Sequence, residues 1–463
     1  MSIPIFEQAN AFNEQGKYSE ALALYDQILA QNHYNNHVLA AMGTILARDQ
    51  KSVGMAITFL HLAVDKSPNP KKPPQEYFAN LAYAYRQSGQ HDVSVKYLEE
   101  ALKIEKTPST LTNYANSFIE QGNAQKAIEL LNQAVKMDPA MTLAHYNLGL
   151  ALLETGQWER AWDEYEYGEH PGGMRLERTY GGKAKWKGPV EEPDKLVCIY
   201  GEQGIGDEIM FASVLPDVLK TNKAIFDCHP RLQTLFEKSF PSVKCYPTRK
   251  ESELFWPDAE PFDVRFAIGS LGKWYRRSRA AFPGTPYLKA DPLLPAGKKL
   301  RVGISWTGGK LTQRVARRTV PLSWWRSILD NDCEFVSLQY TEDCEAEIAL
   351  VEQVQGVTIK QFSEAKDREY YKTAQLVASC DLVISVCTSI VHLAGALGVP
   401  CWVMVPHKPA WRYQASGGMP WYRSVRLYRQ PAADDGAWIP VVGKVGLDLN
   451  DYVDAQREQR KVA

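Results

Sequence analysis

A carboxylate in a glycine-rich turn is the first group in this sequence that could do chemistry. The segment 201–207 joins an apolar run, 196–200, to a second one, 209–219, and ends at Asp207. Gly204 and Gly206 would let backbone N–H groups approach a ligand at a helix start, which favours negative charge. The segment matches neither a P-loop nor a complete dinucleotide fingerprint. Two interpretations of Asp207 therefore stand, a helix cap and a base that takes a proton from a hydroxyl.

A second strand-to-helix junction carries hydroxyl groups. Thr388 and Ser389 follow the apolar run 382–386 and start a helical stretch that contains His392. Hydroxyls and free N–H groups at a helix start suit a diphosphate. His392 is also consistent with a helix histidine that packs on its neighbours.

Parallel sheets would position both junctions. From residue 171 onward, short β-rich runs alternate with helical ones, which predicts an α/β part with parallel sheets and helices on both faces. The predicted strands are 196–200, 224–228, 300–306, 334–339, 382–386 and 400–405. The proline-rich segment 283–299 would link two such sheets. Two open α/β domains that face each other form a cleft at the carboxyl ends of their strands, where such folds bind ligands.

The first 170 residues predict a helical repeat. Four glycines are each followed five residues on by Ala or Ser and four residues later by Tyr or Leu; the glycines are Gly16, Gly89, Gly122 and Gly156. The last three lie 33 and 34 residues apart, which is the tetratricopeptide period. A weaker unit contains Gly43, Ala56 and Leu60. About five helical hairpins are therefore expected, forming a solenoid of the kind that binds partners in a concave groove.

Three asparagines occupy one position of the first helix in successive repeats, namely Asn80, Asn113 and Asn147. An amide both donates and accepts, so such a row in the groove could hold an extended acceptor peptide by its backbone. The alternative is that asparagine is simply common at this repeat position.

Five motifs occur in order along the chain: 201–208, 302–306, 318–322, 335–339 and 382–400. Together they resemble the heptosyltransferase-like glycosyltransferases of family nine, and more closely bacterial proteins that join tetratricopeptide repeats to such a GT-B domain. The protein O-GlcNAc transferases have a related architecture, although their catalytic motifs fit less well. The resemblance implies a repeat array at 1–170 and two Rossmann-like halves, 171–295 on the acceptor side and 296–463 on the donor side.

The resemblance also implies an activity, an inverting transfer from a nucleotide sugar to a hydroxyl that requires no metal and no further cofactor. In heptosyltransferases the aspartate of the Gly-Asp pair is the proposed base, and Asp207 matches it. The implied donor-binding residues on the second half are Trp306, Arg318, Gln339, Thr388, Ser389 and His392. Among these, Arg318 matches a basic residue that contacts donor phosphates in relatives.

One departure from the family pattern is Cys387, at a position where relatives usually have aspartate. That aspartate is expected to bind the sugar or to shape the donor pocket, and a thiol cannot accept a sugar hydroxyl as a carboxylate does. Either the donor preference has shifted or activity is reduced. The alternative function is therefore a non-catalytic tetratricopeptide scaffold with a degenerate nucleotide-sugar-binding domain.

Charge is balanced globally but clustered locally. Fifty-three basic and 54 acidic side chains give a net charge of −1, which excludes the global field of a sequence-blind nucleic-acid binder. Lys273, Arg276 and Arg277, interleaved with aromatic residues, could bind a phosphorylated glycan, a modified nucleic acid or an acidic protein as acceptor. A solvated helix face explains them equally well. A second cluster comprises Lys310, Arg314, Arg317 and Arg318.

The remaining composition indicates a soluble cytoplasmic protein, with oligomerisation left open. Hydrophobic residues make up 45% and charged residues 23% of the chain, which excludes collagen-like and disordered classes. The eight cysteines form no C-x-x-C pair, so we expect reduced thiols and no zinc site. The sequence begins without the basic and apolar regions of a secretory signal. The apolar stretch 382–405 contains polar residues and a proline, and it predicts strand, helix and strand instead of a membrane span.

Overall fold

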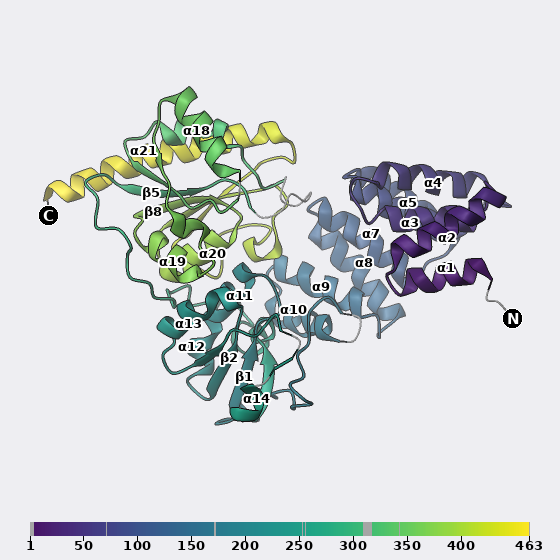
Figure 1. Cartoon of the computed structure of the whole chain (residues 1–463), viewed down its shortest axis with the longest axis horizontal. Helices are drawn as coiled ribbons and strands as arrows, with labels where there is room; N and C mark the ends of the chain where they lie inside the picture. Colours follow the sequence, from purple (N-terminus) through teal and green to yellow (C-terminus); the bar gives the residue numbers. More distant parts are fainter. Residues whose placement is uncertain are drawn as a thin grey trace. The chain divides into compact units, whose positions relative to one another are not determined.

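A computed structural model describes residues 4–70, 72–170, 173–251, 253–254, 256–308, 317–341 and 343–462. Lys310 and Arg314 of the second basic cluster lie outside these residues. The chain divides into two compact units, Met1–Ala151 and Leu152–Ala463 (Figure 1). Each unit has its own architecture and is described separately.

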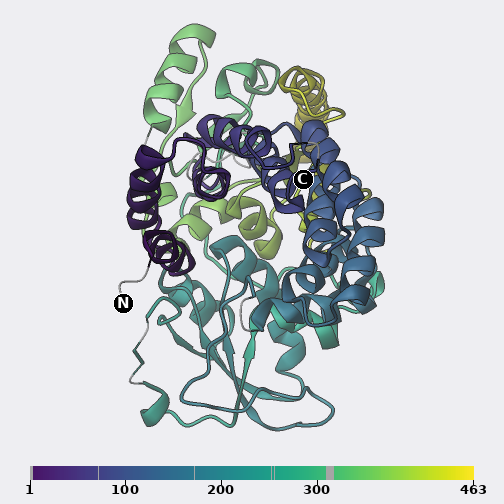
Figure 2. The same ribbon diagram turned by 90° about the vertical axis from the view of Figure 1, so that its right-hand side faces the viewer.

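The first unit is built from helical hairpins that follow one another along a curved array (Figure 2). Its helices are α1 (Ile5–Glu14), α2 (Tyr18–Gln31), α3 (Asn36–Leu46), α4 (Val53–Asp65), α5 (Gln75–Gln87), α6 (His91–Ile104), α7 (Pro108–Glu120), α8 (Ala124–Met137) and α9 (Thr142–Glu154). Consecutive helices pair, α1 with α2, α3 with α4, α5 with α6 and α7 with α8. The predicted hairpins are confirmed.

The recurring glycines and small residues explain the hairpins. Gly16, Gly89 and Gly122 have φ of +74°, +82° and +81°, the left-handed conformation that a glycine adopts without steric cost. Ala21 and Ser94, five residues after their glycines, are fully buried where the second helix of the hairpin meets the first. The glycines and small residues therefore recur in the sequence because each hairpin needs a tight turn and a close contact between its two helices.

The last predicted repeat helix, α10 (Trp158–Tyr165), belongs to the second compact unit. Its Trp162 is almost fully buried, and the indole Nε1 donates to the backbone oxygen of Arg276 at 2.8 Å. A Cβ at Gly272 would come within 2.5 Å of the same indole. The compact units thus divide within α9, before residue 170, because α10 buries its aromatic face against the α/β part.

The second unit holds two parallel sheets. The first has the order β3-β2-β1-β4 and the second the order β10-β9-β8-β5-β6-β7. Their strands are β1 (Leu196–Tyr200), β2 (Lys223–Asp227), β3 (Lys244–Tyr246), β4 (Val264–Ala267), β5 (Arg301–Ser305), β6 (Glu334–Ser337), β7 (Ile359–Lys360), β8 (Leu382–Val386), β9 (Cys401–Val405) and β10 (Val425–Arg429). In the described residues every pair of neighbouring strands is parallel. The expected α/β organisation is confirmed.

Helices cover both faces of the second sheet, with α18 and α21 on one side and α19 and α20 on the other (Figure 1). The helices of this unit after α10 are α11 (Ile205–Phe211), α12 (Leu215–Val218), α13 (Gln233–Ser239), α14 (Trp256–Ala259), α15 (Gly272–Tyr275), α17 (Arg326–Leu329), α18 (Cys344–Gln355), α19 (Tyr370–Ala378), α20 (Ser389–Leu397) and α21 (Trp438–Val462). Alternate strand residues such as Ile304 and Ile384 share one apolar core with Ile348 of α18 and Val445 of α21.

Two local predictions have different outcomes. The apolar run 209–219 was expected to continue one helix, but it is broken into α11, a short 3-10 turn (Ala212–Val214) and α12. Pro216 contributes to the break because it lacks a backbone N–H. The stretch 382–405 forms β8, α20 and β9, as predicted. Among the described residues, none of the helices combines the length and apolar character that a membrane span requires.

Candidate functional site

Asp207 lies in the first turn of α11, at the carboxyl end of β1. The helix is capped by Gly204 without a side-chain hydrogen bond, so the interpretation of Asp207 as a helix cap is wrong. Its carboxylate is ion-paired with Arg412, and each side chain is 19% exposed. Arg412 belongs to a short 3-10 turn (Trp411–Tyr413) after β9. The pair therefore links α11, which follows β1 of the first sheet, to the turn that follows β9 of the second sheet.

Gly206 serves helix packing. A Cβ at this position would lie 3.1 Å from Cδ2 of His392 and 3.3 Å from Cα of Ser389, so α11 and α20 approach closely here. At Gly204, by contrast, a Cβ would have only Asp207 within 4 Å. Of these two glycines, Gly204 is the one with space around its Cα.

Both hydroxyls at the start of α20 form hydrogen bonds within the chain. The Thr388 side chain accepts a hydrogen bond from the backbone N–H of Ile390 at 3.3 Å and so caps the helix. Ser389 Oγ accepts from the Tyr370 hydroxyl at 2.8 Å. His392 is buried, with Nδ1 3.3 Å from the Tyr422 hydroxyl. Burial, reinforced by the charge of Arg412, lowers the pKa of His392 well below its usual range, so its ring is neutral.

Arg318 stands beside this helix start. Its Nε is buried and has no hydrogen-bond partner in the described part of the chain. A Cβ at Gly308 would lie 3.1 Å from Cγ2 of Thr388 and 3.5 Å from Nη2 of Arg318, so the loop after β5 passes between them. A guanidinium, a glycine backbone and a helix N-terminus thus meet at one place, which is a chemistry that suits phosphate.

The side chains of Gln339 and Trp306 do not point to the place where Arg318, Gly308 and the start of α20 meet. The Gln339 amide oxygen accepts from the backbone N–H groups of Trp306 and Thr307 at 3.1 and 3.2 Å, and its nitrogen donates to the Thr307 oxygen at 2.8 Å. The Trp306 ring lies in the apolar core and donates to Glu347. Both expected donor contacts are therefore corrected, because these buried side chains brace the β5 loop.

Cys387 is buried at the end of β8, and its thiol donates weakly to the Met404 backbone oxygen at 3.9 Å. Burial raises its pKa to about 12, although Tyr413, Arg318 and Arg412 act in the opposite direction. The side chain is therefore a neutral thiol at physiological pH.

The expected acceptor residues of the first basic cluster are largely occupied. Arg276 is 2% exposed and donates to Asp217 Oδ2 and to the Ser213 backbone oxygen, each at 2.8 Å. Its assignment to an acceptor surface is corrected, since burial leaves it no access to a macromolecule. Arg277 is 37% exposed and faces Asp163 at 3.5 Å, while Lys273 is half-buried.

The asparagines of the repeat array are half-buried side chains. Asn147 Nδ2 donates to Oδ1 of Asn116 in the preceding hairpin at 2.9 Å. One member of the expected row therefore binds another repeat, which leaves Asn80 and Asn113 as the members to test for peptide binding.

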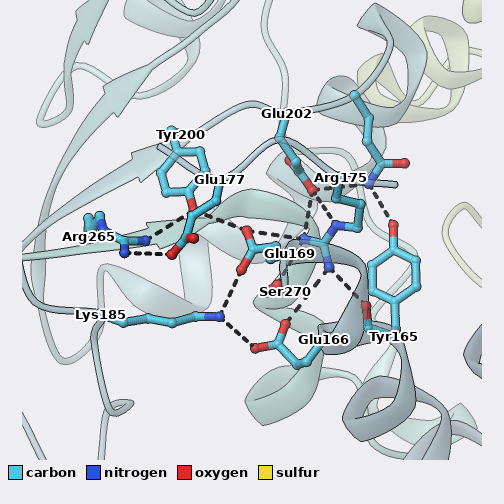
Figure 3. A network of polar contacts seen from close by, with 11 residues as sticks. Tyr165, Glu166, Glu169, Arg175, Glu177, Lys185, Tyr200, Glu202, Arg265 and Ser270 are labelled. Atoms are coloured by element: carbon cyan, nitrogen blue, oxygen red, sulfur yellow. Dashed lines mark hydrogen bonds and ion pairs between the residues drawn. The ribbon is translucent and has the colours of Figure 1, made fainter. Parts of the chain in front are cut away.

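A buried network of charges that sequence reasoning missed lies at the carboxyl end of β1 (Figure 3). At its centre is Arg175, 1% exposed, which donates to Glu202 Oε1 and to Ser270 Oγ, each at 2.8 Å. Its guanidinium also stacks over the Tyr165 ring, 4.3 Å from the centroid. Glu169 Oε1 lies 3.7 Å from Arg175. The network holds the turn between β1 and α11 in place through the Arg175–Glu202 pair.

A second buried pair supports the same turn. Glu208 Oε2 lies 3.2 Å from Arg249 Nε, and Glu208 Oε1 accepts from the His229 backbone N–H at 2.7 Å. Burial raises the pKa of Glu208 to about 8, although Arg249 opposes the shift. A Cβ at Gly201 would come within 2.1 Å of Glu208 Oε2. Gly201 is therefore required by this pair, whatever else the turn binds.

A cavity of about 950 Å³ opens at this end of the first sheet. Its lining includes Tyr180, Gly201, Glu202 and Arg249. Arg178, also in the lining, ties the segment 176–181 to the segment 248–251, since its guanidinium donates to backbone oxygens of residues 248, 249 and 251. The size is that of a small-molecule site.

The described residues contain no group of three or more His, Cys, Asp or Glu side chains that could hold a metal ion. In the Asp330–Asp332 turn, Asp332 pairs with Lys299 at 2.6 Å and also with Arg457, while Asp330 faces Arg326. These carboxylates are thus occupied by cations of the chain.

Comparison with protein families supports the repeats. Tetratricopeptide repeat models match residues 6–69, 77–140 and 114–173. The first unit thus contains tetratricopeptide repeats, and the match continues through α10. The solved structures of MamA and of the tetratricopeptide protein YrrB are each 18% identical, with TM-scores of 0.29 and 0.28. They cover 36% and 38% of this chain and 92% and 89% of their own, and scores this low add nothing to the argument.

Two curated relatives extend the comparison. Protein FlbA of Caulobacter vibrioides is 27% identical over 96% of this chain and 83% of its own length. The probable UDP-N-acetylglucosamine–peptide N-acetylglucosaminyltransferase SPINDLY of Hordeum vulgare is 26% identical over 34% of this chain, which spans only 17% of that relative. One relative thus covers both units, and the other is named for a sugar transfer.

Proposed function

We propose that this chain is a glycosyltransferase with a GT-B arrangement, which moves a sugar from a nucleotide-sugar donor to a hydroxyl of an acceptor that the repeats position. The observation that carries the proposal is the meeting of Arg318, Gly308 and the start of α20, where the buried Arg318 Nε has no hydrogen-bond partner among the described residues. A leaving diphosphate needs positive charge and helix N–H groups at that point. The SPINDLY relative supports the same class of reaction.

The proposed division of labour follows the two sheets. The second sheet would hold the donor through Arg318, Thr388 and Ser389, and the first would receive the acceptor. We propose the domain boundaries 170/171 and 295/296, a cytoplasmic setting and a reaction that needs no metal. The acceptor is a protein, a glycan or a modified nucleic acid, and the nucleotide and sugar are to be found by experiment.

The experiment is a thermal-shift panel of nucleotide sugars and the matching free nucleotides. A ligand that binds only the folded state stabilises it by about 2.7 kcal/mol at one hundred times its Kd, so a donor is visible. Arg318→Met should weaken binding by roughly ten- to one-hundredfold, the effect of one charge-assisted hydrogen bond. Arg326→Met is the matched control, since Arg326 is 63% exposed in a surface pair. Equal affinity in wild type and Arg318→Met would contradict the proposed phosphate site.

A second candidate function is a scaffold in which the repeats are the working part. Two observations favour it. Asp207, the expected base, is ion-paired with Arg412, and Cys387 is a neutral thiol. Cys387→Asp distinguishes the candidates. A donor that binds wild type supports the enzyme, whereas a donor that binds only Cys387→Asp supports the scaffold.

A further inference from the structure

The ion pair between Asp207 and Arg412 lies next to the start of α20. A Cβ at Gly206, the residue before Asp207, would come within 3.3 Å of the Cα atom of Ser389, the first residue of that helix. Burial and then the charge of Arg412 lower the pKa of His392 in the same helix. The pair therefore adjoins the place where the donor's phosphates are proposed to bind.

Three guanidinium groups gather around the end of β8. Burial raises the pKa of the Cys387 thiol to about 12, and the charges of Arg318, Arg412 and Arg429 are among the effects that oppose this shift. Among the described residues, Arg412 is the one of these three arginines that is ion-paired with a carboxylate, that of Asp207. Three guanidiniums and one carboxylate leave two positive charges in excess. That excess matches a diphosphate group, which carries a negative charge on each phosphate.

Both members of the pair are accessible to a ligand, since each side chain is 19% exposed. Arg412 is also held by few contacts. Its guanidinium donates to Asp207, and its Nε has no hydrogen-bond partner in the described part of the chain. Arg175, by contrast, is 1% exposed and donates to both Glu202 and Ser270. Arg412 can therefore change its partner by breaking one ion pair, whereas Arg175 is fixed in a network.

The backbone next to Arg412 is fixed by the end of α9. Gln414 has φ of +59° and ψ of 158°, a conformation that only glycine adopts freely. Its Nε2 donates to the Leu153 backbone oxygen at 2.8 Å, and the Ala415 backbone N–H donates to the Glu154 backbone oxygen at 3.1 Å. A strained backbone persists where the surrounding contacts over-determine it. A change of partner by Arg412 is therefore a rotation of its side chain on a fixed turn.

We propose that Arg412 exchanges partners when the donor binds, pairing with Asp207 in the free protein and with the donor's diphosphate, beside Arg318, in the complex. The inference rests on the glycosyl transfer proposed above. A guanidinium binds phosphate oxygens in a bidentate geometry, as it does a carboxylate, so the diphosphate can replace Asp207. The freed Asp207 carboxylate then accepts a hydrogen bond from the acceptor's hydroxyl group. The ion pair is thus the resting state of a site that becomes complete only after the donor has bound.

Competition between Asp207 and a diphosphate for one guanidinium predicts effects of opposite sign on binding. Isothermal titration calorimetry with ADP, GDP, UDP and inorganic pyrophosphate identifies a probe that the wild type binds. Arg412→Met should weaken the binding of that probe by about tenfold or more, the loss of a charge-assisted hydrogen bond. Asp207→Asn should tighten it by about threefold or more, because the probe no longer has to displace a carboxylate. A merely structural ion pair predicts no such gain in affinity.

The double variant separates exchange from general repulsion. If Asp207 acts through Arg412, adding Asp207→Asn to Arg412→Met should leave the Kd of the single variant unchanged within about twofold. A carboxylate that only repels the probe would give the same tightening with and without Arg412. Asp330→Asn is the matched control, because it removes one carboxylate from the exposed Arg326–Asp330 pair. Its Kd should stay within about twofold of the wild-type value.

The outcomes distinguish this inference from the proposed function. Unchanged affinity in Arg412→Met or in Asp207→Asn, or a tightening that persists in the double variant, would overturn the inference. If Arg412→Met does not fold, Arg412→Gln takes its place with the same expected loss. Binding that Arg318→Met weakens and Arg412→Met does not would overturn the inference alone. A wild type that binds none of the four probes would contradict the proposed donor site, and this inference with it.

Discussion

The carboxyl ends of the two sheets balance their charges in opposite ways. At the first sheet, Arg175 and Arg249 form ion pairs, and three buried carboxylate oxygens accept no hydrogen bond from the described residues, namely those of Glu166, Glu202 and Glu208. At the second sheet, Cys387 is neutral, and the Nε atoms of Arg318 and Arg412 have no hydrogen-bond partner among the described residues. One end thus has buried acceptors without a donor, and the other has buried cationic donors without an acceptor, among the described residues. Two similar strand–turn–helix units have acquired complementary chemistry through the residues packed around them.

The largest expected effect tests whether charge pairing holds the first end together. Arg175→Leu leaves Glu202 and Glu169 buried without their cation, and the free energy of unfolding should fall by about 3–5 kcal/mol. At the second end, Arg318→Leu should cost less than about 1 kcal/mol, since none of the described carboxylates is ion-paired with Arg318 and would lose its cation. Urea denaturation followed by circular dichroism measures both.

Arg160→Leu is the control for this comparison, because Arg160 is 49% exposed and pairs with Glu164 one helical turn away on α10. It should change stability by only about 0.3–0.5 kcal/mol. Equal losses in Arg175→Leu and Arg318→Leu would remove the contrast between the two ends.

The next effect tests whether the second end depends on close packing. A Cβ at Gly395 would lie 2.3 Å from Cγ of Tyr422, so Gly395→Ala should destabilise the protein by about 1–3 kcal/mol. Gly443 in α21 has open space where a Cβ would be. Gly443→Ala should therefore stabilise by about 0.5–1 kcal/mol, since glycine is unfavourable inside a helix. Thermal unfolding of both variants measures these changes in stability. If Gly395→Ala stabilised the protein, α20 would have to be able to shift away from Tyr422.

The smallest effect is a pH dependence with opposite signs. The pKa of Glu208 is raised to about 8, so its contribution to stability is complete below its usual pKa and is lost as pH rises through about 8. The pKa of His392 is lowered, so its contribution is complete above its usual value and is lost as pH falls. Glu208→Gln should thus gain stability relative to wild type toward high pH, and His392→Gln toward low pH.

The stability difference between each variant and wild type should change by at most about 1.4 kcal/mol per pH unit, the slope for one proton, over a urea-denaturation series from about pH 5 to pH 8. Parallel pH profiles for wild type and both variants would show that neither group is held by burial.

The sequence predicts the parts of this molecule that rest on local periodicity. Gly89 and Gly122 mark turns because only glycine adopts their backbone conformation freely, and the strands β1 and β8 are apolar along their length. The short strands β3, β4 and β7 and the edge strand β10 were missed. They have too few residues, or too many exposed ones, for an apolar run.

The candidate site was predictable only in part. Thr388 and Ser389 lie where a strand-to-helix junction places them. The Arg175–Glu202 pair joins residues 27 positions apart in the sequence, and no spacing rule connects them. Trp306 and Gln339 were assigned to a ligand by resemblance, yet their side chains point inward to brace a loop. Two carboxylates at Glu166 and Glu169, just before a glycine-rich linker, were the one available signal of the buried network.

The crowding at Gly201 has a genetic consequence. The position looks like part of a ligand-binding glycine motif, but the backbone there is pressed against the Glu208 carboxylate and the Arg249 side chain. A library of Gly201→Ala clones should therefore yield intragenic suppressors at position 208, with Glu208→Asp foremost because its carboxylate is drawn back. Gly201 is therefore needed to make room for the Glu208–Arg249 pair, and its presence is no evidence that the turn binds phosphate.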